Sequence, residues 1–367
     1  MGMANLDPAT ASGEELLAAI QDYSVEKGAS DIHTSPEREG VRIEVRLDGQ
    51  LRPVRTVTKE EYETFVRQVK FESKLKLNIQ NVPQDGQYSF RHKDRLVNVR
   101  VATLPTRFGE TLTLRFLDPA RGIQPLQTLG FPQDVIADLE AIAKLPYGLV
   151  LVTGPTGSGK TTTLYALLQS IIGTARNIIT LEDPVEYEIP GIVQSEIDPD
   201  HGFTFASGLR SVLRHDPNVI LVGEIRDLET AQTAIDAALT GHLVLSTLHT
   251  NSAIEAIPRL LSMGVSPYTF APALRAVLAQ RLVRTVKPEL RGTAFDAASP
   301  DSYEGRMCLP ELLKVTPALR DLILTQERED LLETQARKDG YLTMKEWGAV
   351  VAEQGITSKE EVARVTG

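Results

Sequence analysis

The first part of the chain has the hydrophobic pattern of a small mixed domain. Hydrophobic and polar residues alternate over residues 41–47, and two later stretches repeat this period. A period of two is typical of strands with one buried face. Residues 16–23 and 62–69 instead carry their hydrophobic side chains at helical spacing. The pattern predicts an α+β domain over residues 1–118.

The pattern changes after a segment rich in Gly and Pro, and we assign residues 119–144 to a linker and a lead-in helix. Short, continuously hydrophobic runs then alternate with helical stretches. Such runs are typical of a mostly parallel sheet that is covered on both faces. They indicate an α/β core over residues 145–265. The four runs are 149–152, 177–181, 219–222 and 242–246. Residues 266–367 lack strong strand signals, so they are expected to be mainly helical.

Composition narrows the function classes. The chain has 367 residues, of which 42% are hydrophobic, and its net charge is -10. A negative total argues against nucleic acid as the main partner, because phosphate binding needs a basic surface. The single cysteine, Cys308, excludes a disulfide within the chain and a zinc site of several thiolates. The N-terminal sequence has no signal-peptide pattern, and no run approaches the roughly 20 hydrophobic residues of a membrane span.

A phosphate-binding loop follows the first hydrophobic run of the α/β core. The sequence fits G-x-x-x-x-G-K-[ST], in which backbone N–H groups surround phosphate oxygens. Lys160 is predicted to reach the β- and γ-phosphates, and the Thr161 hydroxyl to bind magnesium. The motif is specific here because it follows a strand and opens a helix. The residues predicted to contact ATP are Gly154, Pro155, Thr156, Gly157, Ser158, Gly159, Lys160, Thr161 and Thr162.

Acidic residues follow two further hydrophobic runs. Glu224 comes after 219–222, where a second acidic group near the metal is expected, although aspartate is commoner there. Glu182, Asp183 and Glu186 leave the run 177–181, and carboxylates in this place orient or deprotonate the attacking water. A capped acidic turn is the alternative interpretation of that segment.

Two histidines flank the last run of the core. His249 follows it and His242 begins it, and either ring could hydrogen-bond a γ-phosphate. From chemistry alone, a structural role is the more frequent one for a single histidine at a strand end.

Several motifs together resemble the secretion ATPases that drive type II secretion and type IV pili, and most closely their GspE/PilB branch. The resemblance extends over residues 14–366. Its motifs are Gly28-Ala-Ser-Asp-Ile-His33, the phosphate-binding loop, Leu181-Glu-Asp-Pro-Val-Glu186, Val222-Gly-Glu-Ile-Arg-Asp227 and Thr240-Gly-His-Leu-Val-Leu-Ser-Thr-Leu-His-Thr-Asn251.

The resemblance implies roles for individual residues. Glu186 would be the catalytic carboxylate, with Glu182 and Asp183 beside it in the family's Asp box. Glu224 would be the Walker B acid that helps to hold magnesium. His249 and His242 would belong to the family's His box.

The resemblance also implies a shared active site. Arg100 and Arg115 would complete the ATP site of a neighbouring subunit in a homohexamer. The pattern alone leaves a solvated strand face as an alternative, since both arginines lie at polar strand positions. The fold would be a RecA-like α/β ATPase domain behind a smaller α+β domain of PAS-like type.

Two departures from the family pattern stand out. Members usually carry a four-cysteine zinc loop after a segment like Leu278-Ala-Gln-Arg-Leu-Val-Arg284, but no cysteine follows here, so zinc is not expected. The far N-terminal domain that binds the membrane platform is also missing from this sequence.

The expected function is that of an ATP- and Mg²⁺-dependent motor that powers assembly of a type IV pilus or a type II secretion pseudopilus. Its partners would be copies of itself and an inner-membrane platform protein, at a cytoplasmic location peripheral to that membrane. The alternatives are a PilT-like retraction motor, a nucleotide-gated adaptor without sustained work, and a DNA translocase. The signature of retraction motors is absent from the C-terminal part, and the negative net charge disfavours DNA.

Overall fold

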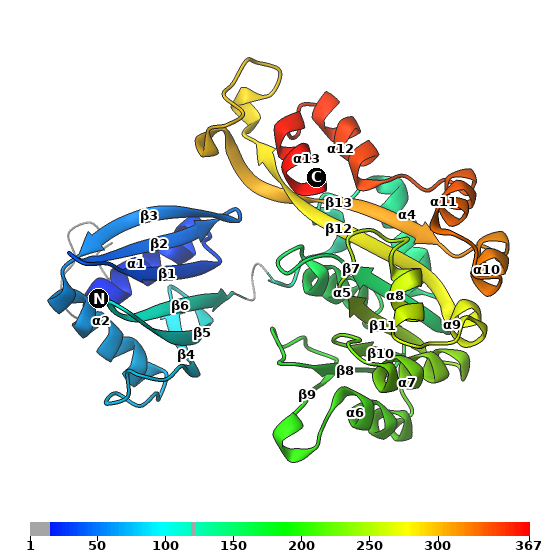
Figure 1. Cartoon of the computed structure of the whole chain (residues 1–367), viewed down its shortest axis with the longest axis horizontal. Coiled ribbons are helices and arrows are strands. Elements are labelled where there is room, and N and C mark those ends of the chain that lie inside the picture. Colours follow the sequence, from blue (N-terminus) through cyan, green and yellow to red (C-terminus); the bar gives the residue numbers. More distant parts are fainter. Residues whose placement is uncertain (1–14, 119–121) are drawn as a thin grey trace. The chain divides into compact units, whose positions relative to one another are not determined.

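The computed structural model describes residues 15–118 and 122–367. The chain divides into two compact units after Gly122, close to the predicted domain end at residue 118. Residues 119–121, the start of the predicted linker, lie outside the described residues. Figure 1 shows a sheet with helices in each unit. The units are described separately below as the N-terminal domain and the ATPase domain.

The N-terminal domain is an antiparallel sheet with two helices, and so has the predicted α+β composition. The strand order is β3-β2-β1-β6-β5-β4, and every neighbouring pair is antiparallel. The elements are α1 (Glu15–Lys27), β1 (Asp31–Pro36), β2 (Val41–Leu47), β3 (Gln50–Val57), α2 (Lys59–Glu72), β4 (Gln84–His92), β5 (Arg95–Thr106) and β6 (Gly109–Leu117).

Alternating burial explains how this sheet meets its helices. Val41, Ile43 and Val45 of β2 are buried in one cluster with side chains of α1 and α2, as the period-two pattern predicted. Helix α2 begins where Thr58 and Glu61 cap each other's backbone N–H groups. The helices therefore cover one face of the sheet.

The ATPase domain contains a seven-stranded sheet of order β13-β12-β7-β11-β10-β8-β9. All of its neighbouring strands are parallel except the β12–β13 pair. The four predicted strands are confirmed as β7 (Gly148–Thr153), β8 (Ile178–Glu182), β10 (Val219–Val222) and β11 (Leu243–Leu248). The strands that the pattern did not predict are β9 (Val193–Glu196), β12 (Leu274–Val286) and β13 (Tyr303–Lys314).

Helices cover both faces of this sheet, as continuous hydrophobic strands require. In β7, Leu149 and Leu151 join one buried cluster while Val150 and Val152 join the other. The second cluster contains α4 (Gln133–Ala143) and α5 (Lys160–Gln169). The first contains the helices drawn in green and yellow in Figure 1. These helices are α6 (Phe205–Val212), α7 (Leu228–Leu239), α8 (Ala256–Ser262) and α9 (Pro267–Ala273).

The expectation of a mainly helical region after residue 266 is wrong for its first half. β12 extends the parallel sheet beside β7, and β13 returns antiparallel to it. Most positions of both strands are buried, so neither shows the alternation that marks a half-exposed strand. Long-range pairing with β7 decided their conformation. Apart from α9, the α-helices of this region follow after residue 316: α10 (Pro317–Leu324), α11 (Glu329–Lys338), α12 (Met344–Glu353) and α13 (Lys359–Thr366).

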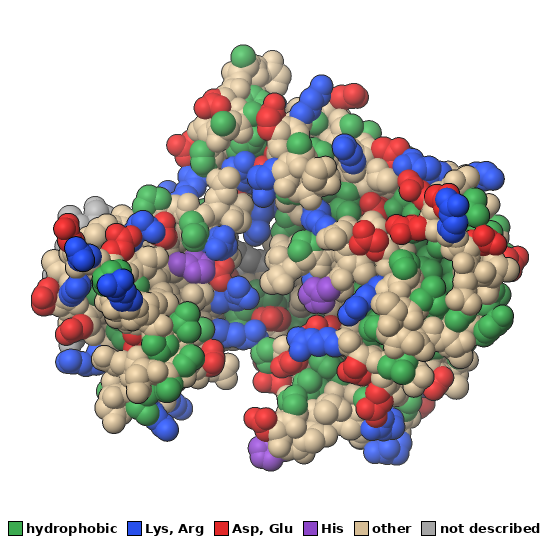
Figure 2. Space-filling view, in the orientation of Figure 1, with side chains coloured by type: hydrophobic (Ala, Val, Ile, Leu, Met, Phe, Trp, Pro, Cys, Tyr) green, Lys and Arg blue, Asp and Glu red, His purple; other side chains and the backbone are tan. Residues whose placement is uncertain are grey.

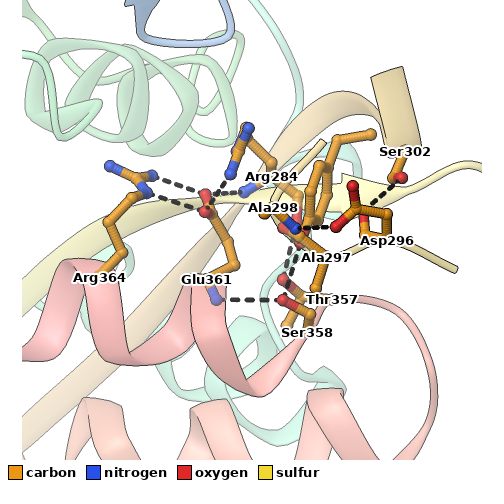
Figure 3. Close-up of polar contacts among 10 residues, drawn as sticks. Arg284, Asp296, Ala297, Ala298, Ser302, Thr357, Ser358, Glu361 and Arg364 are labelled. Carbon is orange, nitrogen blue, oxygen red and sulfur yellow. Dashed lines mark hydrogen bonds and ion pairs between the residues drawn. The ribbon is translucent and has the colours of Figure 1, made fainter. Parts of the chain in front are cut away.

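A buried ionic cluster attaches the last helix to β12 (Figure 3). The Glu361 carboxylate accepts hydrogen bonds from the backbone N–H and the guanidinium of Arg284, the latter at 2.7 Å, and from both sides of the Arg364 fork. The Arg284 guanidinium lies 4.1 Å above the Tyr303 ring. Because the Glu361 side chain is fully buried, the cluster replaces solvent around that carboxylate and fixes α13 to the hairpin.

Within the described residues, no helix has both the length and the hydrophobicity needed to cross a membrane. In the same part of the chain, no group of three or more potential metal-binding side chains comes together. Cys308 lies buried in β13, and burial raises the pKa of its thiol to about 12.

Candidate nucleotide-binding site

The phosphate-binding loop lies between the carboxyl end of β7 and the first turn of α5, where the motif requires it. Its glycines are needed for their backbone geometry. Gly157 and Gly159 have φ of 79° and 89°, in the left-handed region. A Cβ on Gly154 would lie 2.6 Å from both the Gln280 carbonyl oxygen and the Ser158 hydroxyl. The loop therefore presents backbone N–H groups at the positive end of α5.

The Lys160 amine points back into this loop. Its Nζ donates to the carbonyl oxygens of Gly154 at 2.8 Å and of Pro155 at 3.1 Å. Burial lowers the pKa of Lys160, and the negative charge of Glu224 acts in the opposite direction. The amine is thus a cation inside the loop that a phosphate would contact.

Glu224 follows β10, and its negative charge acts on Lys160 of the phosphate-binding loop. The strand end that carries it is fixed by the Ser246 and Thr247 hydroxyls, which donate to the Val222 and Gly223 carbonyls at 2.7 and 2.8 Å. The Glu224 carboxylate is mostly buried and pairs with Arg226 at 2.5 Å. An acid is therefore held at the carboxyl edge of the parallel sheet, as predicted from its place after the strand.

His249 follows β11 and belongs to the same edge. Its Nε2 lies 3.6 Å from the Glu224 carboxylate. Burial lowers the pKa of His249, and the Lys160 charge lowers it further, while Glu224 raises it. The lowered pKa favours the neutral ring, which can donate one hydrogen bond. Of the two predicted histidines, the structure brings this one to the site.

The structure does not bring His242, the other histidine predicted to hydrogen-bond a γ-phosphate, to the phosphate-binding loop, because His242 lies at the amino end of β11. It precedes β11, and its backbone carbonyl accepts from Gly148 N at the start of β7. Its Nδ1 is 2.9 Å from the Ala237 carbonyl oxygen. The six residues of β7 separate that point from the phosphate-binding loop, roughly 20 Å at about 3.3 Å per residue.

The acidic segment after β8 divides into a buried and a more exposed part. The Glu182 carboxylate accepts hydrogen bonds from Tyr165, from Thr180 at 2.5 Å and from Gln194 at 3.1 Å, and the residue is 4% exposed. This burial argues against the predicted contact between Glu182 and a nucleotide. Its carboxylate instead fixes α5 and β9 to the end of β8.

Asp183 is exposed and Glu186 is half-buried on the chain that leaves this anchor. Burial raises the pKa of the Tyr165 hydroxyl, and hydrogen bonds from the backbone of Glu186 and Tyr187 oppose the shift. The Tyr165 side chain thus contacts both Glu182 and the backbone next to the Glu186 side chain. This places Glu186 on a segment that is tied to the helix of the phosphate-binding loop.

The two predicted arginines lie in the N-terminal domain, opposite each other on β5 and β6. The Arg115 Nε donates to Asp31 of β1 at 2.9 Å, and its side chain remains about half exposed. The register of β5 and β6 brings Arg100 and Arg115 to neighbouring positions on one sheet face, whereas the sequence pattern predicted only that each lies at a polar strand position.

Sequence reasoning missed Gln280 of β12. Its side chain is fully buried, and its Nε2 donates to the Ser158 carbonyl of the phosphate-binding loop at 2.7 Å. The available signal was an amide side chain within a run of hydrophobic strand residues. Because that run was taken for part of a helical region, its contact with the loop was not predicted.

The donor set at this edge fits a hydrated magnesium ion. Thr161 is exposed on the first turn of α5, and Glu224 supplies a carboxylate. Magnesium prefers such oxygen ligands and usually combines one or two of them with water and substrate phosphates. Thr161 and Glu224 are thus the residues that would hold it.

The sequence matches the family described as Type II/IV secretion system protein over residues 9–364. It is 42% identical to the Type II secretion system ATPase E of Vibrio cholerae over 96% of this chain and 75% of that protein. The chain belongs to this family of secretion ATPases. It is also 41% identical to the Type IV pilus assembly ATPase PilB of Thermus thermophilus, over 91% of this chain and 41% of that one.

A solved secretion ATPase has the same fold. The structure of the pilus retraction motor PilT with bound ADP matches 95% of this chain and 96% of its own, with a TM-score of 0.68 and 32% identity. The family and this structural match agree with a RecA-like ATPase domain that binds a nucleotide. The resemblance of the motifs to the secretion ATPases is confirmed.

Proposed function

We propose that this chain is a magnesium-dependent ATPase motor that powers assembly of a type IV pilus or a type II secretion pseudopilus. One observation carries the proposal: Lys160, Glu224 and His249 meet at one edge of the sheet, in a chain 42% identical to a type II secretion ATPase. A P-loop lysine, an acid and a neutral histidine together provide the groups that phosphoryl transfer to water needs.

The residues divide the reaction between them. The N–H groups of the phosphate-binding loop and the Lys160 amine hold the phosphates of ATP. Thr161 and Glu224 would hold magnesium, which supplies charge neutralisation for the phosphate oxygens. Glu186 orients the attacking water and takes its proton as the water oxygen bonds to the γ-phosphorus. The bond to ADP breaks, and His249 donates a hydrogen bond to the transferred phosphate.

The arginines of the N-terminal domain complete the site from a neighbouring subunit in a homohexamer. Arg100 and Arg115 are adjacent on one sheet face, and the Arg115 side chain is accessible enough to contact another chain. Phosphoryl transfer is accelerated by arginines that are supplied in trans. The motor would act on an inner-membrane platform protein, peripheral to that membrane, and the N-terminal domain would be PAS-like.

Purified protein tests the catalytic proposal. Wild type should hydrolyse ATP in steady state only with magnesium, and Lys160→Ala should lose nearly all turnover because its phosphate contact is gone. Lys345→Ala, an exposed lysine on α12, is the control and should keep wild-type turnover. A folded Lys160→Ala with normal activity contradicts the site, and a single turnover per binding event supports the adaptor alternative.

A gene deletion in the source organism tests the direction of the motor. Loss of surface pili or of secreted proteins supports assembly, whereas excess pili indicate the retraction function suggested by the likeness to PilT. The identity of 41–42% to assembly and secretion ATPases favours assembly over retraction. On the face in Figure 2, acidic and basic side chains are interspersed over the ATPase domain, which supports a protein rather than a nucleic-acid partner.

A further inference from the structure

The loop that carries His249 shares an anchor with the phosphate-binding loop. Thr153 is the last residue of β7, directly before the phosphate-binding loop, and its hydroxyl accepts from Thr250 N at 2.8 Å. The hydroxyls of Thr153 and Thr250 are themselves 2.8 Å apart. The first residue after His249 is therefore fixed to the strand that positions the phosphates.

The β12–β13 hairpin holds the rest of this loop. The Arg281 Nη2 of β12 donates to the Asn251 carbonyl oxygen at 3.1 Å and to its Oδ1 at 3.3 Å. Ala253 N donates to Oε1 of Glu311, on β13, at 2.7 Å. The two strands of the hairpin therefore hold the loop at two points that are two residues apart. The Arg281 cation binds Asn251, and the Glu311 anion binds Ala253.

Glu311 is a buried carboxylate whose two oxygens bind two different segments. The residue is 4% exposed. While Oε1 accepts from Ala253, Oε2 accepts from Met344 N, at the start of α12, at 3.2 Å. Burial raises the pKa of Tyr341, and the charge and hydrogen bonding of Glu311 raise it further, so that hydroxyl also contacts the carboxylate. A buried charge is stable only when partners of this kind satisfy it.

Arg281 lies within electrostatic reach of the reacting groups. The pKa of Lys160 is lowered by burial and, to a smaller degree, by the Arg281 charge. The hairpin therefore acts on the site in two ways, through the loop backbone and through this charge.

We propose that Glu311 is a positioning residue for ATP hydrolysis, which with Arg281 holds the 249–253 loop so that His249 stays beside Glu224. The inference rests on the proposed hydrolysis of ATP at the phosphate-binding loop. Catalytic groups must be held within about half an ångström of their productive geometry, and supporting hydrogen bonds provide that precision. The Glu311 carboxylate contacts the 249–253 loop at Ala253, and its other contacts are with Met344 and Tyr341, so it acts on the site through the loop.

The test is Glu311→Gln, which keeps the size of the side chain but turns one acceptor into a donor that faces a backbone N–H. We expect kcat for ATP to fall about tenfold or more, with KM changed less than twofold, because misplacement of a catalytic group by about 1 Å costs up to 10²-fold. Glu304→Gln is the matched control: it lies exposed on the same strand and should leave kcat unchanged.

A double-mutant cycle with His249→Ala separates positioning from general destabilisation. If Glu311 acts through His249, the double variant has the kcat of His249→Ala alone, because the loop then has no catalytic group to place. Two independent losses that multiply, an unchanged kcat in Glu311→Gln, or an unchanged kcat in His249→Ala would overturn the proposal.

Arg281→Lys provides a second route if Glu311→Gln does not fold. It keeps the charge but loses the guanidinium, whose Nη2 donates to both oxygens of Asn251, and it should show the same loss of kcat and the same non-additivity. Normal kcat in this variant contradicts the proposal. Magnesium-dependent turnover of the wild type and its loss in Lys160→Ala test the proposed function separately, so the two failures are distinguishable.

Discussion

At the scale of single residues, two carboxylates near the nucleotide site have different surroundings and so different expected roles. Glu224 is mostly buried and pairs with Arg226 and His249. Glu186 is half-buried on a segment attached to Tyr165. Glu224 follows β10 at the carboxyl end of the parallel strands, a place that suits a magnesium ligand, whereas Glu186 lies on a connecting segment, a place that suits proton transfer.

Glu186→Gln should bind Mg-ATP normally but hydrolyse it on the order of 10²- to 10⁴-fold more slowly, because it removes the general base. Glu224→Gln should also raise the magnesium concentration needed for half-maximal activity. Nucleotide binding by calorimetry and steady-state turnover measure both effects. Glu188→Gln, exposed two residues further on, serves as the control. Wild-type turnover in Glu186→Gln would show that Glu186 is not the base.

At the scale of elements, the β12–β13 hairpin has three structural roles. It extends the parallel sheet beside β7, supports both nucleotide loops through Gln280, Arg281 and Glu311, and carries the last helix through Arg284. The edge of β12 pairs with β7, while α12 and α13 pack against the hairpin. The hairpin is therefore the element through which the C-terminal region contacts the site.

Glu361→Gln should destabilise the ATPase domain on the order of 3 kcal/mol, because it leaves the buried Arg284 guanidinium without its counter-ion. That corresponds to a loss of about 6 °C or more in Tm for a domain of this size. Glu360→Gln on the same helix is exposed and should change little. A melting temperature equal to that of wild type would contradict the role assigned to this cluster.

The same cluster has a defined pH dependence. Burial would raise the pKa of Glu361, but hydrogen bonds from Arg364 and Arg284 outweigh it and hold the pKa at about 2, against an ordinary value of 4.5. A depressed pKa in the folded state gives stability that is present above pH 4.5 and lost as pH falls towards 2. The difference in Tm between wild type and Glu361→Gln should therefore shrink over this range in thermal melts.

The arm between β12 and β13 should contain no structural zinc. Cys308 alone cannot replace four thiolates, and the arm is held by other contacts: Tyr303 donates its hydroxyl to the Ala297 carbonyl at 2.9 Å. Elemental analysis of purified protein decides the matter. About one zinc per chain would show that the arm has been misinterpreted.

At the scale of the whole molecule, the described residues form two units, and the proposed catalytic groups are divided between them. Lys160, Glu224 and His249 belong to the ATPase domain, while Arg100 and Arg115 belong to the N-terminal domain. Head-to-tail contacts in a closed ring bring unlike surfaces of neighbouring subunits together. The proposed shared site would therefore link the rate of hydrolysis to assembly of the ring.

Mixing two inactive variants tests the shared site. Arg115→Ala and Glu186→Gln should each have little activity, yet rings reassembled from both should regain part of it. Some interfaces then combine an intact Glu186 with intact arginines, which accelerate phosphoryl transfer roughly 10³- to 10⁵-fold in other systems. Arg91→Ala, exposed on β4, is the control and should stay active alone. No recovery in mixed rings, or full activity in a dilute monomer, contradicts sharing.

The sequence by itself determined the features that depend on short stretches of chain. The phosphate-binding loop, its strand and its helix were predictable because glycine geometry and hydrophobic runs are local properties. The place of Glu224 and His249 followed too, since residues after parallel strands meet at one edge. The same rule could have excluded His242, which precedes its strand.

Only the tertiary structure decided the features that depend on distant partners. β12 and β13 became strands because they pair with β7 and with each other, and their burial on both faces hides the period that would have marked them. Glu182 became a buried anchor because Tyr165 and Gln194 come from other elements. Gln280 and Glu311 gained their contacts with the nucleotide loops in the same way. Hydrogen bonds between segments far apart in the chain leave no local pattern, and so they appear only when the chain has folded.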